Sequence, residues 1–211
     1  MTSAPIILPP NDDSVAKVAA ALAEGQLCVI PTDTVYGLAA QIAPEPVARL
    51  YVAKGRPEEK PIPVLVSGLE PVRTVAPDWP EEAQALARAF WPGPLTLVVP
   101  AAPGLPRELT AGTGTVGVRW PANTLATSVI ERAGGALAVT SANRSGEPPA
   151  TSAEEAARML RGSVAYVLDG GSLAGHRPST VVSVTDGELR VLRTGPISLQ
   201  ALRDALARAI S

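Results

Sequence analysis

Short apolar runs alternate along the chain with segments in which apolar residues recur every three or four positions. Runs of this length predict buried strands, and the helical spacing predicts helices between them. We expect strands at 27–30, 62–66, 95–99, 116–119, 137–140, 166–168, 180–184 and 188–192. We expect helices at 15–22, 46–53, 81–90, 124–133, 153–160 and 199–210. Asp186-Gly187, between the last two strands, is a strong hairpin signal.

This order of elements predicts the α/β class. Apolar strands that are buried on both faces need helices to cover them, and at least one hairpin adds antiparallel pairing. We therefore expect a single domain over residues 1–211, with a twisted, mixed parallel and antiparallel sheet flanked by helices. The 211 residues, 46% of them hydrophobic, are enough for a substantial core.

The composition excludes several kinds of site. Cys28 is the only cysteine and His176 the only histidine, so a metal site built from such residues is ruled out. Cys28 lies in an apolar run and is interpreted as core packing, and His176 as a solvated loop residue. The sequence contains no run of about 18 apolar residues, which is the length needed to span a membrane. We expect a cytoplasmic protein whose net charge of −2 does not by itself attract nucleic acid.

Short polar side chains collect where predicted strands end. Thr32-Asp33-Thr34 follows one strand, Thr113, Thr115 and Trp120 lie near Arg119, and a polar segment at 140–146 follows another strand. In α/β sheets ligands bind beyond the carboxyl ends of strands, so these side chains are candidate ligand contacts. The same residue types also build ordinary turns, and the residues alone leave both interpretations open.

A second polar segment, 54–61, places three cations at the end of a predicted helix. Lys54 has an ordinary explanation, because a cation stabilises a helix carboxyl end. Arg56 and Lys60 lie beyond the helix, in a segment made rigid by Pro57 and Pro61, and such a loop suits a phosphate-bearing ligand. Two glutamates in the loop could instead neutralise these cations in a solvated surface loop. The residues alone therefore favour a ligand-binding loop and a solvated loop about equally.

The glycines of Gly112-Thr-Gly-Thr-Val-Gly117 have the spacing of a dinucleotide-binding fingerprint. That motif must follow a strand and open a helix, whereas here the third glycine leads into a predicted strand. No Walker sequence is present either. A bound nucleotide would therefore be held by scattered side chains.

Six motifs, taken together, resemble the YrdC-like family of threonylcarbamoyl-AMP synthases. They occur in the family's order over nearly the whole chain, as Pro31-Thr-Asp-Thr-Val-Tyr-Gly-Leu38, Lys54-Gly-Arg56-Pro with Lys60-Pro61, Trp91-Pro-Gly-Pro-Leu-Thr96, Val116-Gly-Val-Arg119-Trp-Pro121, Thr140-Ser-Ala-Asn143-Arg-Ser-Gly146 and Ser179-Thr-Val-Val182. Because the sequence stops at Ser211, it looks like the family's short form.

The resemblance implies a nucleotidyltransferase that condenses L-threonine, bicarbonate or CO2 and ATP into threonylcarbamoyl-AMP and pyrophosphate, for threonylcarbamoyladenosine in tRNA. It implies Mg²⁺ with ATP, no protein-bound structural metal, and as further partners tRNA and the proteins that transfer the threonylcarbamoyl group. Carried over by position, threonine binds at Thr34, Arg119, Val139 and Ser179. ATP binds at Arg56, Lys60, Thr115, Ser141 and Arg193. Thr32, Lys54, Thr140, Asn143 and Pro149 belong to the same motifs. No residue is assigned as a general base or covalent nucleophile.

The chain departs from the family pattern at a few positions. Leu65 and Asn123 stand where many members have histidine, Pro149 where serine often contacts ATP, and 176–178 replaces a glycine-containing approach to Ser179. Two other functions remain as alternatives. One is a module that binds double-stranded RNA or tRNA without catalysis. The other is a carbamoyl-transfer protein of hydrogenase maturation, whose zinc-binding cysteine motifs a single cysteine cannot supply.

Overall fold

The computed structural model describes residues 4–57, 59–173, 177–185 and 188–210. Within them the strands are β1 (Ile6–Leu8), β2 (Cys28–Ile30), β3 (Gly37–Ala40), β4 (Val64–Val66), β5 (Leu95–Pro100), β6 (Thr115–Arg119), β7 (Ala136–Ser141), β8 (Tyr166–Leu168), β9 (Thr180–Thr185) and β10 (Glu188–Arg193). The helices are α1 (Asp12–Ala23), α2 (Pro44–Lys54), α3 (Val72–Val75), α4 (Glu81–Phe90), α5 (Arg107–Thr110), α6 (Thr124–Arg132), α7 (Ala153–Met159) and α8 (Leu199–Ile210).

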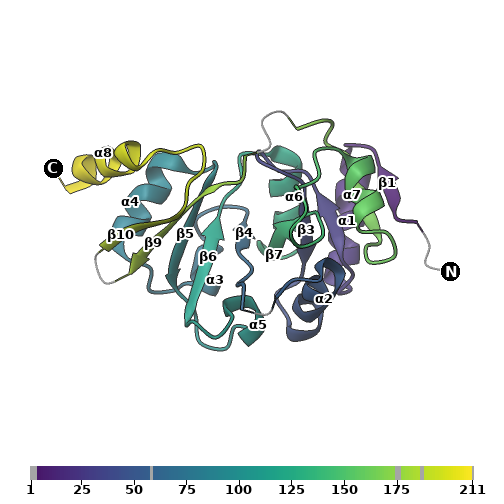
Figure 1. The fold of residues 1–211 in the computed structure, drawn as a ribbon, viewed down its shortest axis with the longest axis horizontal. Helices are drawn as coiled ribbons and strands as arrows, with labels where there is room; N and C mark the ends of the chain where they lie inside the picture. Colours follow the sequence, from purple (N-terminus) through teal and green to yellow (C-terminus); the bar gives the residue numbers. More distant parts are fainter. Residues whose placement is uncertain (1–3, 58, 174–176, 186–187, 211) are drawn as a thin grey trace.

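All the described strands join one sheet in the order β1-β8-β2-β3-β7-β4-β6-β5-β9-β10. Four neighbouring pairs are parallel (β1 with β8, β8 with β2, β4 with β6, β5 with β9), and the other five are antiparallel. The sheet is therefore mixed, as predicted. Its two edge strands, β1 and β10, lie at opposite ends of the molecule, near the two chain termini (Figure 1).

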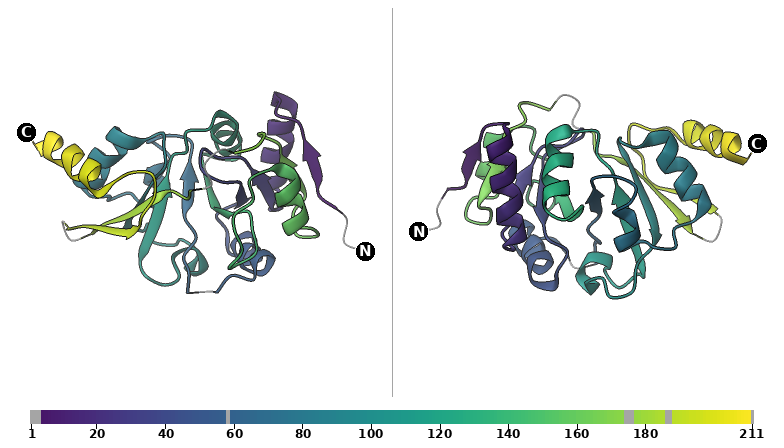
Figure 2. Two further views of the ribbon diagram at one scale, coloured as in Figure 1. Left: turned by 45° about the horizontal axis from the view of Figure 1, so that its top comes forward. Right: turned by 180° about the vertical axis from the view of Figure 1, so that it is seen from behind.

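The helices cover both faces of this sheet. On one face α1 and α6 pack side by side, as the right-hand view of Figure 2 shows, over a cluster that includes Val18, Ile30 and Leu137. The larger cluster, on the other face, contains buried residues of α2, α4, α7 and α8 together with the alternate strand positions, such as Val29 and Val64. Neighbouring residues of one strand are therefore buried in different clusters, so both faces of the strand are apolar. This explains why the strands appear in the sequence as continuous apolar runs.

Every predicted strand and helix is present, with ends that shift by at most three residues. The first helix has its N-cap at Asn11, whose side chain accepts a hydrogen bond from Ser14 N (2.9 Å). Ser152 caps α7 by accepting a hydrogen bond from Glu155 N (3.2 Å). The predicted hairpin turn, 186–187, lies outside the described residues, but β9 and β10 pair antiparallel on either side of it.

β1, β3, α3 and α5 were not predicted from the sequence. The most important of them is β3, Gly-Leu-Ala-Ala, in which glycine and alanine have low strand preference and every residue is buried, so no alternation marks it. It pairs with β2 and β7 and closes the middle of the sheet. No helix among the described residues is long and apolar enough to cross a membrane.

Candidate functional site

A cavity of about 150 Å³ lies over the middle of the sheet, on the face that carries α1 and α6. Its lining comes from β3 to β7, from the end of β10, and from the segments between β2 and β3, between α2 and β4, and before β9. The lining residues are Thr32, Thr34, Val35, Gly37, Arg56, Pro63, Leu65, Thr96, Arg119, Val139, Thr140, Ser141, Pro178, Ser179 and Arg193. A larger cavity of about 530 Å³ lies between α2 and α5, and of the predicted site residues it contains none. The smaller cavity is therefore the candidate site.

The position of this cavity differs from the expected place beyond the carboxyl ends of strands. β7 is antiparallel to β4 and β4 is parallel to β6, so the carboxyl ends of β6 and β7 point to opposite edges of the sheet. Residues from these two ends can meet only above the sheet's face. Small residues there leave the space open: a Cβ on Gly37 would lie 2.6 Å from Val139 Cγ1.

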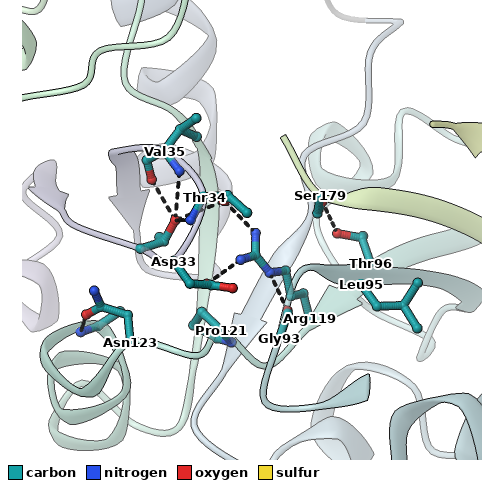
Figure 3. A network of polar contacts seen from close by, with 12 residues as sticks. Asp33, Thr34, Val35, Gly93, Leu95, Thr96, Arg119, Pro121, Asn123 and Ser179 are labelled. Carbon is teal, nitrogen blue, oxygen red and sulfur yellow. Dashed lines mark hydrogen bonds and ion pairs between the residues drawn. The ribbon is translucent and has the colours of Figure 1, made fainter. Parts of the chain in front are cut away.

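Arg119, at the end of β6, is only 5% exposed, and all three of its guanidinium nitrogens bond to the protein. Nε donates to Gly93 O (2.9 Å), Nη1 to Thr34 Oγ1 (2.9 Å) and Nη2 to Asp33 Oδ1. Figure 3 shows the guanidinium group between Thr34 and Asp33. Burial lowers the pKa of Arg119, and the adjacent Asp33 carboxylate opposes that shift. Arginine stays protonated in proteins, so this is a fixed, neutralised cation.

The turn at 32–34 is both structural and part of the site. Thr32 Oγ1 accepts from Val35 N (3.2 Å) and donates to Val35 O (2.6 Å), which closes the turn and matches the ordinary interpretation. Asp33 and Thr34 instead hold Arg119. Asp33 was predicted only as part of this polar turn and was not assigned to threonine or ATP, and the structure shows that its carboxylate pairs with Arg119.

Arg56 and Arg193 form the other end of the cavity. Arg56 donates from Nε to Lys60 O (3.0 Å) and from Nη2 to Pro61 O (2.9 Å), and so fastens its own loop. Arg193 donates from Nε to Ser179 O (3.1 Å) and from Nη2 to Ser179 Oγ (3.0 Å). Burial lowers the pKa of both guanidinium groups, and the positive charge of Arg56 lowers the pKa of Arg193 further. Neither forms an ion pair with a carboxylate among the described residues.

Lys54 is more than a cation at the end of α2. It is 2% exposed, and its Nζ donates to Ser141 O, Asn143 O (2.6 Å) and Asn143 Oδ1 (3.0 Å). The ordinary explanation for this lysine is therefore incomplete, because the ammonium group also fastens the loop after β7. Burial, and secondarily the charge of Arg56, lower its pKa to about 8. Asn143 Nδ2 in turn donates to Glu147 O (2.6 Å) and continues the same loop.

Ser179 and Thr96 are joined side by side at the floor of the cavity. Their hydroxyl oxygens lie 2.7 Å apart, and both residues are buried (Figure 3). Ser179 was a predicted site residue, whereas Thr96 was named only within a motif. Trp91, in the same motif, has a structural role: its Nε1 donates to Leu95 O (2.7 Å), and its ring stacks on Trp79 at a centroid distance of 5.9 Å.

Nine of the predicted residues line the cavity: Thr32, Thr34, Arg56, Arg119, Val139, Thr140, Ser141, Ser179 and Arg193. Lys54 and Asn143 lie behind it and support its wall, while Lys60, Thr115 and Pro149 are not among its lining residues. Leu65 and Val139 give the floor an apolar patch. The Val139 N–H is already bonded to Pro63 O (2.9 Å). His176 lies outside the described residues.

Among the described residues, no cysteine, histidine, aspartate, glutamate, lysine or tyrosine side chain lines this cavity. Cys28 is fully buried, and burial raises the pKa of its thiol to about 12, so the core interpretation is confirmed. Among the described residues no group of three histidine, cysteine, aspartate or glutamate side chains could hold a metal ion. Asn123 caps α6 by accepting from Ala126 N (2.9 Å). The glycines at 112–117 lead into β6, so the dinucleotide motif is excluded as predicted.

These features define an α/β protein with an open mixed sheet and a cationic ligand cavity on its face. The chain belongs to the Sua5/YciO/YrdC family, whose model, described as telomere recombination, matches residues 20–195. A Pyrococcus abyssi relative named threonylcarbamoyl-AMP synthase is 40% identical over 184 residues, which cover 87% of this chain and 54% of that protein. The chain thus spans about half the length of this relative.

A Mycobacterium tuberculosis relative, named putative threonylcarbamoyl-AMP synthase, is 41% identical over 193 residues, which cover 91% of this chain and 88% of that protein. A crystal structure of Pyrococcus abyssi Sua5 complexed with L-threonine is 37% identical, has a TM-score of 0.91 and matches 95% of this chain and 60% of its own. The predicted family and fold class are confirmed.

Proposed function

We propose that this protein is an L-threonylcarbamoyladenylate synthase, a nucleotidyltransferase that serves tRNA modification. The observation that carries the proposal is one cavity with two cationic ends. Arg119 and Thr34 offer directed donors to a carboxylate, and Arg56 and Arg193 offer unneutralised charge to phosphates. The names of the relatives, and the L-threonine in the Sua5 crystal structure, support the same ligands.

The reaction needs no covalent enzyme intermediate. The amine of L-threonine adds to CO2 and loses a proton to give a carbamate, and a carbamate oxygen then attacks the α-phosphorus of ATP while pyrophosphate leaves. Arg119 and Thr34 would hold the threonine carboxylate, and Arg56 and Arg193 would hold the phosphates near the carbamate. Lys54 would keep Ser141 in position through the loop it fastens. Positioning and charge neutralisation then supply most of the catalysis.

Mg²⁺ belongs to this proposal as a companion of ATP. Magnesium commonly keeps several waters and binds through substrate phosphates with one or two carboxylates, and it would neutralise phosphate charge during attack. Asp33, the carboxylate bonded into this network, is committed to Arg119. The chain's own residues therefore suit a metal that arrives on the nucleotide. We also propose bicarbonate as the carbon source, tRNA and threonylcarbamoyl-transfer proteins as later partners, and a cytoplasmic location.

The test is the product of the reaction. Protein incubated with Mg²⁺, ATP, L-threonine and bicarbonate should release pyrophosphate, and omission of either L-threonine or bicarbonate should abolish that release. Mass spectrometry of the quenched mixture should find the threonylcarbamoyl adduct of AMP. Orthophosphate release, or a folded protein that forms no adduct, contradicts the proposal. An RNA-binding module would release no pyrophosphate and would instead shift RNA in a gel in a salt-dependent way.

A further inference from the structure

Thr96 lines the cavity beside Ser179, and the hydroxyl groups of the two residues are hydrogen-bonded. Thr96 lies in β5, and Ser179 precedes β9, the strand that pairs in parallel with β5 at Leu95 and Thr180. Strand pairing thus brings the two hydroxyl groups together, 2.7 Å apart and each no more than 5% exposed. At this distance one hydroxyl group donates a hydrogen bond to the other, and which of them donates decides whether Ser179 keeps a proton to offer to a ligand.

The environment of Ser179 restricts that choice. Its oxygen accepts a hydrogen bond from Arg193 Nη2 (3.0 Å), while Arg193 Nε donates to its carbonyl (3.1 Å). The Ser179 hydroxyl therefore has one proton and one lone pair left. If Thr96 donates into that lone pair, the Ser179 proton is free to point at a ligand in the cavity. If Ser179 donates to Thr96 instead, Ser179 has no proton left to offer.

The orientation of Thr96 is fixed by packing. A β-branched side chain has few χ1 choices, and the Thr96 methyl lies where Gly117 has no side chain: a Cβ on Gly117 would be 3.2 Å from Thr96 Cγ2 and 3.4 Å from Pro63 Cβ. Gly117, the third glycine of the segment at 112–117, thus has a structural role. It makes room for the methyl group and leaves the Thr96 hydroxyl directed at Ser179.

We infer that Thr96 is a positioning residue. Its hydroxyl donates a hydrogen bond to Ser179 Oγ, so that the Ser179 hydroxyl can donate a hydrogen bond to a carboxylate oxygen of the amino-acid substrate. A bound anion favours this proton arrangement, because hydrogen bonds to charged acceptors are the stronger ones. The inference rests on the proposed function for the identity of the ligand. It adds a residue whose role is to set the direction of the Ser179 hydroxyl group.

The experiment is a double-mutant cycle with Thr96→Val, Ser179→Ala and the double variant, read out as KM for L-threonine and for ATP and as L-threonine binding by calorimetry. Thr96→Val keeps the shape of threonine, and it should raise KM for L-threonine roughly fivefold, which corresponds to one neutral hydrogen bond, with KM for ATP unchanged. The double variant should be no worse than Ser179→Ala, because Thr96 acts through Ser179. Thr96→Ser should restore most of the affinity.

Several outcomes would overturn the inference: an unchanged KM for L-threonine in Thr96→Val, equal effects on both substrates, full additivity with Ser179→Ala, or no rescue by serine. If Thr96→Val does not fold, Gly117→Ala replaces it. Its new methyl pushes on Thr96 Cγ2 and should raise KM for L-threonine while leaving KM for ATP unchanged. If the wild-type protein binds no L-threonine, the proposed function itself is contradicted. That outcome is distinct from a failure of the inference about Thr96, in which the wild-type protein binds L-threonine and the Thr96 variants do not behave as expected.

Discussion

Arg119 at one end of the cavity and the pair Arg56 and Arg193 at the other have their charges balanced differently. Arg119 is almost fully buried, bonds to the protein through all three nitrogens and is neutralised by Asp33. Arg56 donates from Nε and Nη2 to the carbonyl oxygens at 60 and 61, and Arg193 donates from the same two nitrogens to the carbonyl and hydroxyl oxygens of Ser179. Neither has a carboxylate partner among the described residues.

The difference indicates what each end recognises. The desolvation of Arg119 is already offset within the protein, so a ligand there adds directed hydrogen bonds to a fixed group more than it neutralises charge. At the other end Arg56 lies close enough to lower the pKa of Arg193, and a bound polyanion would relieve that repulsion. One end therefore selects by geometry, as a carboxylate requires, and the other by charge, as phosphates require.

The largest expected effect is that of Arg119→Ala. Loss of charge-assisted bonds worth about 1.5–3 kcal/mol each should raise KM for L-threonine by roughly 100-fold, with KM for ATP changed much less. Removal of the partner of the mostly buried Asp33 should also lower the free energy of unfolding, by up to about 3–5 kcal/mol. Steady-state kinetics and chemical denaturation measure the two effects.

Two further variants control this experiment. Arg190 forms an exposed pair with Glu188, so Arg190→Ala should change the unfolding free energy by at most about 1 kcal/mol and leave both KM values unchanged. Arg119→Lys keeps a charge near Asp33 and should recover stability more than threonine affinity, because lysine lacks the planar fork. Equal increases in both KM values for Arg119→Ala would contradict the division of the cavity.

A smaller effect, of opposite selectivity, is expected for Arg56→Ala. Loss of one charge-assisted contact should weaken ATP binding by roughly tenfold, and the loss should shrink as salt is added, because this end is only half-buried. Calorimetry with L-threonine alone should show nearly normal binding. Arg73→Ala removes an exposed cation from α3 and is the matched control for net charge. Intact ATP affinity in Arg56→Ala would mean that the basic loop is only a solvated surface.

The smallest effect concerns pH and Lys54. As the pH rises through about 8, the folded protein loses the Lys54 proton and one of three donors that fasten the loop after β7, so kcat/KM for ATP should fall severalfold. The free energy of unfolding should instead increase as the pH rises. The unfolded chain keeps this proton up to 10.5, so the folded state gains stability between pH 8 and 10.5 as a buried charge is removed. Lys54→Met should lack that gain, and a gain equal to that of wild type would contradict the assignment.

The site could be predicted from the sequence where a motif supplies a residue whose chemistry has one obvious use. Arg119, Arg56 and Thr34 are of this kind, and the structure brings all three to one cavity. Asp33 and Thr96 could not be predicted in this way, because each acts through a partner far away in the sequence. Lys54 was assigned to its motif, but its bonds to Ser141 and Asn143 depend on how α2 ends against the loop after β7.

The fold divides along the same line. Local sequence determined the elements with clear periodicity and caps, and the α/β class follows from their alternation, because side-chain period and burial are local properties. Tertiary structure alone decided β3, whose four residues, three of them glycine or alanine, form a strand through hydrogen bonds to β2 and β7. It also decided the strand order and register, and these place Arg119, Ser179 and Thr96 side by side. The contacts of these residues reach partners up to 86 positions away, and no local pattern encodes which distant strand supplies the partner.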